Sequence, residues 1–415
     1  MEIKRDYYLN KLIQRENNGL IKIITGIRRC GKSYLLNNIF KNYLLSKGVS
    51  EQNIIAIALD DVENEQLRNP SELSKYVKSK IINENMHYVL LDEIQLVDNF
   101  VAVLNGLLRI SNVDTYVTGS NSKFLSTDIV TEFRGRGDEI RVYPLSFSEF
   151  SSVYEEKNEA WNDYYTYGGL PLLLLQNSDE ARMDYLTSQA KNVYLNDVIE
   201  RNNVQNTDEL TSLVEIISSS IGSLTNSTKL SNTFKSKMNS TITDKTIRNY
   251  LNYLEEAFLI EKSNRYDVKG KKYIDTPLKY YFTDIGIRNS LLNFRQQEEN
   301  HIMENIIYIE LRRRGYNVDV GIVDVREKNG GVTNRKQLEI DFLANKGNNK
   351  IYIQSALYMP TQEKVEQEQR PLLKVNDSFK KIIVVRDEIK RKRDENGIIT
   401  MGLFDFLLDI NSLDY

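Results

Sequence analysis

Residues 21–33 constrain what this chain can fold into more than any other segment. A short apolar run is followed by the spacing G-x-x-x-x-G-K-S, which begins at Gly26, and then by a helical pattern of apolar residues. Strand, loop and helix in this order are typical of a phosphate-binding loop, because Gly26 and Gly31 permit backbone angles that turn consecutive N–H groups toward phosphate oxygens. The motif predicts that Lys32 reaches the β- and γ-phosphates of a nucleotide and that the Ser33 hydroxyl coordinates Mg²⁺.

The predicted nucleotide contacts extend over the whole loop and into the first turn of the helix that follows it. The positive end of that helix dipole is directed at the same anion. The residues concerned are Gly26, Ile27, Arg28, Arg29, Cys30, Gly31, Lys32, Ser33 and Tyr34. An ordinary strand-to-helix turn with an exposed lysine is the alternative, and a second motif argues against it.

The second motif lies at the end of a buried-strand pattern, where residues 88–91 run into Asp92 and Glu93. In a phosphate-loop enzyme an acidic residue at this position holds Mg²⁺, and a neighbouring acid orients and polarises the attacking water. We assign the first role to Asp92 and the second to Glu93. Four apolar residues before two acids could also be a strand that enters a solvated turn. The two motifs together predict binding of ATP or GTP.

A fourth strand pattern ends at Thr118 and enters a serine-rich segment. In a parallel sheet this end lies beside the γ-phosphate, so Asn121 could sense the phosphate or help to place the water, with Thr118 and Ser120 as less favoured candidates. A serine-rich turn is the alternative. Arg134 and Arg136 are flanked by glycines and could stabilise transition-state charge from a neighbouring subunit. A solvated or nucleic-acid-facing loop explains these two arginines equally well.

Composition narrows the class of protein further. The 415 residues are too many for one core and suggest roughly two to four domains. No apolar stretch approaches the roughly 20 residues that cross a bilayer, and the N-terminus lacks the apolar core of a secretory signal. The single cysteine, Cys30, excludes an internal disulfide framework, so we expect a cytoplasmic protein with no membrane partner. The formal net charge of −3 gives no global field for nucleic acid, so any such contact must be local.

Taken together and in order, the motifs resemble those of a known family. They lie in residues 25–33, 91–95, 118–122, 134–137, 144–150 and 167–171. They are similar to the motifs of prokaryotic AAA+ ATPases, in the branch whose ATPase domain is followed by a domain of unknown function. The resemblance covers nearly the whole chain, and it implies an α/β ATPase core, a helical lid, a winged helix and a nuclease-like C-terminal fold.

The expected fold class is therefore α/β, with a parallel phosphate-loop sheet and a second α/β fold of the restriction-endonuclease type. Strand and helix patterns alternate after residue 20, which by itself implies a parallel sheet. The expected domains are an AAA+ core at 1–150, a helical lid at 151–205, a winged helix-turn-helix at 206–290 and a PD-(D/E)XK nuclease-like domain at 291–415.

The expected winged helix follows from helical patterns at 227–237 and 243–257 and from two strand patterns that flank a turn at Gly270. Basic side chains gather on these segments, and they could neutralise the phosphates of double-stranded DNA. They are Lys235, Lys237, Lys245, Arg248, Lys262, Arg265, Lys269, Lys271 and Lys272. Winged helices also contact proteins, and several acids dilute this patch, so a DNA partner and a protein partner both stay open.

The C-terminal pattern of a helix, a strand and a hairpin places Glu304, Asp341 and Gln354 where PD-(D/E)XK nucleases hold Mg²⁺. Two departures weaken this site. Gln354 is an amide rather than a carboxylate, which suits a hard cation less well, and Ala356 stands where the lysine is expected. Lys364 on the next helix could substitute in space. A degenerate nuclease fold kept for binding is therefore favoured over active cleavage.

The sequence thus favours a cytoplasmic AAA+ protein that hydrolyses ATP with Mg²⁺ and couples its nucleotide state to a C-terminal binding domain. Lys32, Ser33, Asp92 and Glu93 carry the proposed chemistry, and a trans-acting arginine would require a homo-oligomer. Two alternatives stay open. One is an ATP-gated DNA nuclease, and the other is a nucleotide switch that works as a scaffold without hydrolysis.

Overall fold

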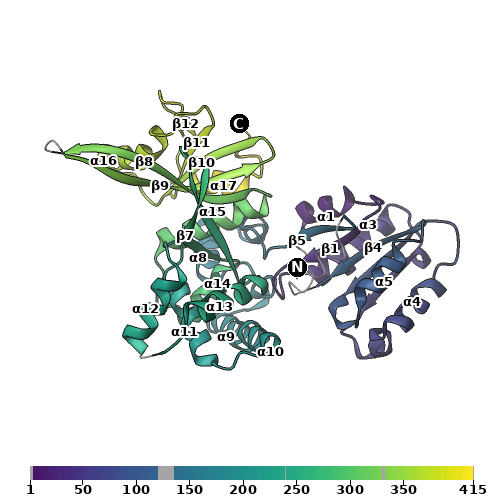
Figure 1. Cartoon of the computed structure of the whole chain (residues 1–415). Helices are drawn as coiled ribbons and strands as arrows, with labels where there is room; N and C mark the ends of the chain where they lie inside the picture. The colour runs from purple at the N-terminus through teal and green to yellow at the C-terminus, as the bar shows by residue number, and fades with distance from the viewer. Residues whose placement is uncertain (1–2, 120–134, 239, 330–331, 415) are drawn as a thin grey trace. The chain divides into compact units, whose positions relative to one another are not determined.

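The computed structural model describes residues 3–119, 135–238, 240–329 and 332–414. The chain divides into two compact units, which Figure 1 draws in the colours of the sequence. The first unit holds residues 1–144 with the short segments 170–172 and 256–258. The second unit holds the remaining residues, from 145 onward. Each unit contains one of the two sheets.

The first unit is built on a five-stranded sheet in the order β2-β3-β4-β1-β5. Its strands are β1 (Ile21–Thr25), β2 (Ile54–Ala58), β3 (His87–Asp92), β4 (Val113–Thr118) and β5 (Gly137–Arg141). Every neighbouring pair is parallel, so the predicted parallel sheet is confirmed. Because parallel strands end at the same edge, the loop after β1, the acids after β3 and the end of β4 share one edge of the sheet.

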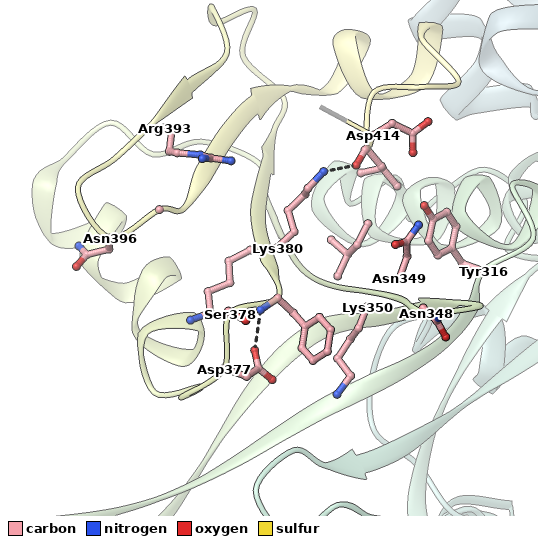
Figure 2. A pocket seen from close by; sticks show the side chains of 15 residues that line it. Tyr316, Asn348, Asn349, Lys350, Asp377, Ser378, Lys380, Arg393, Asn396 and Asp414 are labelled. Atoms are coloured by element: carbon pink, nitrogen blue, oxygen red, sulfur yellow. Dashed lines mark hydrogen bonds between the residues drawn. The ribbon is translucent and has the colours of Figure 1, made fainter.

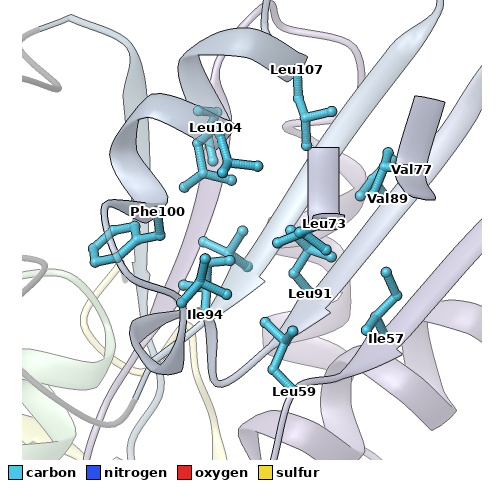
Figure 3. Packing of buried hydrophobic residues seen from close by; sticks show 14 of the residues in the cluster. Ile57, Leu59, Leu73, Val77, Val89, Leu91, Ile94, Phe100, Leu104 and Leu107 are labelled. Atoms are coloured by element: carbon cyan, nitrogen blue, oxygen red, sulfur yellow. The ribbon is translucent and has the colours of Figure 1, made fainter. Parts of the chain in front are cut away.

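Helices cover this sheet and supply most of the core. They are α1 (Asp6–Ile13), α2 (Lys32–Tyr34), η1 (Leu35–Phe40), α3 (Lys41–Ser46), η2 (Glu51–Asn53), η3 (Val62–Arg68), α4 (Pro70–Ser79), η4 (Ile94–Leu96) and α5 (Phe100–Leu107). Figure 3 shows apolar side chains of α4 and α5 packed on those of β2 and β3. Near-continuous apolar runs such as that of β3, in which every residue is buried, are typical of strands covered on both faces.

The start of α4 is fixed by a side-chain cap. Asn69 is the cap, since its side-chain oxygen accepts hydrogen bonds from the N–H groups of Ser71 (2.9 Å) and Glu72 (3.3 Å). Pro70 takes the first helical position, where its missing N–H costs no hydrogen bond. Asn69 and Pro70 together therefore set where the helix begins.

The second unit is built on an eight-stranded mixed sheet in the order β12-β13-β11-β10-β9-β8-β6-β7. Its strands are β6 (Ile260–Asp267), β7 (Lys272–Phe282), β8 (Asn317–Asn329), β9 (Val332–Lys346), β10 (Asn349–Ala356), β11 (Lys380–Val385), β12 (Lys392–Arg393) and β13 (Ile399–Gly402). The predicted hairpin of β9 and β10 is confirmed by their antiparallel pairing. The hairpin of β6 and β7 is not free-standing, because β6 also pairs in parallel with β8.

The helices from residue 147 onward are α7 (Phe147–Ser151), α8 (Lys157–Tyr167), η6 (Pro171–Leu175), α9 (Asp179–Ser188), η7 (Gln189–Leu195), α10 (Asn196–Asn202), α11 (Thr207–Ser219), α12 (Ser227–Met238), α13 (Asp244–Glu256), α14 (Ile285–Leu291), α15 (Glu299–Arg313), α16 (Gln362–Leu373) and α17 (Leu403–Leu408). The buried Asp284 caps α14 through Ile287 N–H (3.0 Å) and also accepts a hydrogen bond from Gly169 N–H (2.8 Å). Among the described residues, no helix has the length and apolar character needed to cross a membrane.

Candidate nucleotide site

The phosphate loop follows β1, and its shape requires glycine at two positions. Gly26 has a φ of +141° and Gly31 a φ of +95°, both in the region that side chains disfavour. A Cβ atom on Gly26 would lie 2.1 Å from the carbonyl oxygen of Val142. Arg5, which the sequence analysis missed, supports the same loop by donating to the carbonyl oxygens of Cys30 (3.2 Å) and Tyr143 (2.7 Å).

Lys32 is buried within this loop. Its ammonium donates hydrogen bonds to the carbonyl oxygens of Gly26 (2.9 Å) and Ile27 (3.0 Å). Arg28 and Arg29 are exposed, whereas Cys30 between them and the helix is buried. Tyr34 is 44% exposed in the first turn of the helix. The predicted loop residues therefore lie together between the end of β1 and the first turn of that helix.

Asp92 meets this helix at the carboxyl edge of the sheet. Its carboxylate accepts a hydrogen bond from the Thr118 hydroxyl, and the Ser33 hydroxyl lies close enough to lower its pKa. Asn37 Nδ2 approaches the same carboxylate at 3.4 Å. The two residues predicted to hold a metal ion, Ser33 and Asp92, thus lie close together.

Burial raises the pKa of Asp92 above its usual range. Hydrogen bonds from Thr118 and Ser33 oppose this change, and the negative charges of Glu93 and Asp60 add to it. A cation at this carboxylate would favour its ionised form. The site therefore suits a metal ion electrostatically as well as through its oxygen donors.

Glu93 is held in an unusual backbone conformation, with a φ of +54°. Its N–H donates to the Thr118 hydroxyl oxygen (3.0 Å), and its carboxylate accepts a hydrogen bond from the Gln95 side chain. Thr118, the less favoured candidate at the end of β4, therefore links the two acids. A signal for Asn37 was present, because it lies one helical turn after Ser33. Gln95 gave no such signal.

Three of the predicted residues remain: Asn121, Arg134 and Arg136. Asn121 and Arg134 lie outside the residues that the structure describes. Arg136 donates to Asn105 Oδ1 (2.9 Å), and its carbonyl oxygen accepts a hydrogen bond from Ile21 N–H (2.9 Å) at the start of β1. Because β1 and β5 are parallel, Arg136 lies at the amino edge of the sheet, opposite to Lys32. It cannot contact a nucleotide bound to its own phosphate loop.

A second polar cluster lies in the second unit. Lys279 of β7, which the sequence analysis missed, pairs with Glu304 of α15 (2.9 Å) and with Glu339 of β9 (2.7 Å). Glu304 also accepts a hydrogen bond from the Tyr281 hydroxyl (2.7 Å), and Asp341 accepts one from the backbone N–H of residue 355 (2.8 Å). We call Lys279, Glu304, Glu339, Asp341 and Gln354 the Glu304 cluster.

Lys279 neutralises much of the charge in the Glu304 cluster. Although burial lowers the pKa of Lys279, the carboxylates of Glu304, Asp341 and Glu339 raise it above its ordinary value. Burial and the Glu304 charge raise the pKa of Asp341. Lys364 is not in the cluster, because it pairs with Glu368 (2.5 Å). No group of three or more histidine, cysteine, aspartate or glutamate side chains forms a metal site in the described part of the chain.

Several of the basic residues proposed to contact DNA interact with other side chains of this chain. Arg248 pairs with Asp244 (2.6 Å), and Lys262 pairs with Glu255 (3.0 Å). Arg265 is only 7% exposed and donates to the Gln337 side chain. DNA contact by this segment stays a prediction.

Comparison with known proteins finds two domain families in the chain. Residues 18–151 match an AAA domain, and residues 158–298 match a domain of unknown function (DUF8612). An uncharacterized protein of Haemophilus influenzae is 33% identical over 413 residues, which cover 98% of each chain. An uncharacterized protein of Methanocaldococcus jannaschii is 32% identical over 354 residues, which cover 80% of this chain and 74% of that protein.

Solved structures are similar only distantly. The crystal structure of Cdc6p from Pyrobaculum aerophilum aligns with 73% of this chain and 93% of its own, at 12% identity and a TM-score of 0.30. A likeness this weak says nothing about what the present chain binds.

Proposed function

Since the chain belongs to the same family as its Haemophilus influenzae relative and carries an AAA domain at residues 18–151, we propose that it is an ATPase. It binds ATP with Mg²⁺ on the loop from Gly26 to Ser33 and hydrolyses the bond between the β- and γ-phosphates. One observation carries the proposal: Asn37, one turn after Ser33 on the helix that follows the loop, donates a hydrogen bond to the Asp92 carboxylate at the end of β3 (3.4 Å).

The residues at this edge fit a magnesium ion. A hydroxyl and a carboxylate are the hard oxygen donors that Mg²⁺ prefers, and Ser33 and Asp92 would hold it there. When bound, the ion neutralises charge on the β- and γ-phosphate oxygens. Gly26 is required for the shape of the loop, because any side chain at this position would meet the Val142 carbonyl.

The protein's own groups divide the remaining work. Lys32 exchanges its two loop carbonyls for phosphate oxygens when ATP binds. Glu93 orients and polarises the attacking water, and Gln95 positions the Glu93 carboxylate through its hydrogen bond. Thr118 fixes the turn that carries both acids, because its hydroxyl contacts Asp92 and the Glu93 N–H at once.

An ATP turnover assay on the full chain tests this assignment. Glu93→Gln should keep ATP binding and lose at least about 100-fold in turnover, because a positioned general base contributes about 10²–10⁴-fold. Lys32→Ala should lose binding itself. Lys47→Ala is the control, since Lys47 is half-exposed and pairs with Glu16 instead. Wild-type protein that binds ATP without turnover would instead support the non-hydrolysing scaffold.

We also propose that ATP turnover is coupled to the C-terminal half of the chain in the cytoplasm. In this proposal residues 1–150 form the AAA+ core, 151–205 a lid, 206–290 a winged helix and 291–415 a nuclease-like fold. Double-stranded DNA and a protein are the candidate partners, and a homo-oligomer would let Arg134 or Arg136 act on a neighbouring site. The ATPase rate with and without double-stranded DNA, measured beside the oligomeric state, tests partner and assembly together.

We propose that the C-terminal fold binds rather than cleaves. Glu304, Asp341 and Gln354 supply two carboxylates and an amide, and Lys279 already pairs with Glu304 at 2.9 Å. A metal ion would have to compete with this buried ammonium. Metal-dependent DNA cleavage that disappears in Asp341→Ala would support the alternative, an ATP-gated nuclease.

A further inference from the structure

A basic pocket in the second unit has no role in the proposed ATPase. It lies where β10 and β11 begin, and its volume is about 590 Å³. We define it by Lys350, Lys380, Lys381 and Arg393, and Figure 2 shows the side chains that surround it. The register of the two parallel strands places Lys380 beside Ile351 at this end, three residues before Gln354 of the Glu304 cluster. The pocket and that cluster therefore belong to different ends of β10.

Cationic side chains outnumber acids in the lining of the basic pocket. Against its four cations stand two carboxylates, those of Asp377 and Asp414. The Asp377 carboxylate already accepts hydrogen bonds from the Tyr352 hydroxyl (2.7 Å) and from the N–H of Phe379 (3.2 Å). Neutral donors thus occupy both of its oxygens, and the pocket keeps an excess of positive charge.

Two lysines of the pocket donate hydrogen bonds to backbone carbonyls. Lys380 Nζ donates to the carbonyl oxygen of Leu413 (2.5 Å), and Lys381 Nζ donates to that of Val375 (2.9 Å). Burial lowers the pKa of Lys380, and the positive charges of Arg391 and Arg393 lower it further, whereas the negative charge of Asp414 raises it. Because like charges repel in a confined space, an anion that enters the pocket would relieve this repulsion.

An aromatic ring lies beside the cations. Phe379 is 41% exposed, and Lys350 Nζ lies 4.7 Å from the centre of its ring. An exposed ring next to basic groups is the combination that stacks a nucleobase while its phosphate is neutralised. The volume also falls within the roughly 300–1,000 Å³ typical of small-molecule pockets, far more than one phosphate ion needs.

We propose that the basic pocket binds a nucleoside phosphate, with the phosphate near Lys380 and Arg393 and the base against Phe379. The same chemistry is offered by a free nucleotide and by the phosphorylated end of a nucleic-acid strand. The proposal is independent of ATP turnover, because it uses no residue of the phosphate loop.

Fluorescence anisotropy on the full chain can test the pocket and separate the two sources. The probes are a labelled single-stranded oligonucleotide with a 5′-phosphate, the same strand without it, and AMP as competitor. All measurements use Lys32→Ala protein, so that the phosphate loop does not contribute. A strand end is the ligand if the 5′-phosphorylated probe binds and AMP does not displace it, and a free nucleotide is the ligand if AMP binds with the higher affinity.

Matched variants then assign the binding to this pocket. Arg393→Gln should weaken binding of the phosphorylated probe about tenfold, the usual loss for one charge-assisted hydrogen bond. Lys392→Gln is the control, because this exposed neighbour in β12 is not part of the lining and should leave affinity within about twofold. Lys350→Gln provides a second, independent substitution. The proposal fails if no probe binds below about 1 mM, or if both pocket variants bind as tightly as the parent protein.

Discussion

Replacement of Thr118 by valine should damage the candidate nucleotide site without changing its shape. The Thr118 side chain is fully buried, and its hydroxyl donates to the Asp92 carboxylate while it accepts from the Glu93 N–H. Valine keeps the volume and removes both hydrogen bonds. Since water cannot replace the lost hydroxyl at a fully buried position, the carboxylate and the N–H each lose a partner.

The expected cost follows from these two bonds. A hydrogen bond to a charged group contributes about 1.5–3 kcal/mol, and an unsatisfied buried N–H costs about 1–3 kcal/mol. We therefore expect the free energy of local opening at the end of β3 to fall by roughly 3 kcal/mol, since the two terms share one group and do not add fully. Hydrogen exchange at the Glu93 amide should accelerate by about 100-fold.

The pH dependence of ATP turnover provides the functional measurement. The Thr118 hydrogen bond is the largest influence that lowers the pKa of Asp92, whereas burial raises it. Its removal leaves Asp92 protonated up to a higher pH, and a protonated carboxylate does not hold Mg²⁺. The acid limb of the pH–rate profile should therefore move to higher pH in Thr118→Val.

Thr115→Val is the matched control. Thr115 is also buried in β4, but it lies three positions before Thr118, so its side chain points to the other face of the sheet. It should leave both the Glu93 exchange rate and the acid limb unchanged. If Thr118→Val behaves like this control, the hydroxyl does not organise the two acids and our account of the site is wrong.

Three further substitutions test other parts of the structure. Gly26→Ala should abolish ATP binding because its Cβ meets a carbonyl at 2.1 Å, whereas Gly48→Ala, also at positive φ but with nothing within 4 Å, should cost only about 1 kcal/mol of stability. Lys279→Met leaves buried carboxylates without their cation and should lower the stability of the second unit by about 3–5 kcal/mol. Lys262→Met removes a more exposed ion pair and should cost less than about 1 kcal/mol. Burial raises the pKa of Asp284 to about 6, so between about pH 4 and 6 the native state keeps a proton that the unfolded chain has released. The contribution of Asp284 to stability should fall by about 3 kcal/mol as the pH rises through this window. In Asp284→Asn the melting temperature should therefore depend less on pH between about pH 4 and 6. If the melting temperatures of the variant and the wild type have the same slope against pH, the assignment is wrong.

The parallel sheet of the first unit could be predicted because its signals are local. Each strand is a short apolar run, and each functional residue lies directly after one, as Asp92 does after β3. Strand direction then decides which residues share an edge. The same argument explains why Ser33 and Asp92 meet although 59 positions separate them in the sequence.

Residues that act from a different element could not be predicted in this way. Lys279 lies on β7, 25 residues before Glu304, and nothing in its local sequence distinguishes it from the surrounding basic residues. The sequence favours Lys364 as the lysine near Gln354, but Lys364 pairs with Glu368. Only the order of strands in the eight-stranded sheet and the packing of α15 on it bring Lys279 to these carboxylates.

The two acidic clusters of this chain differ in the source of their positive charge, and this difference leads to a last prediction. The hydrogen bonds of Asp92 come from hydroxyls and an amide, so a cation must be supplied from outside the protein. The carboxylates of Glu304 and Glu339 are neutralised by Lys279 from within.

Mg²⁺ with ATP should therefore protect the amides at the end of β3 from hydrogen exchange and leave α15 and β9 unaffected. In Lys279→Met the Glu304 cluster loses its lysine, so Mg²⁺ or Mn²⁺ should then raise the lowered melting temperature of the second unit part of the way back. Lys262→Met is the matched control, and its melting temperature should not recover with these ions. If divalent ions protect α15 and β9 in the wild-type protein, Lys279 does not substitute for a metal ion, and the case for a nuclease becomes the stronger one.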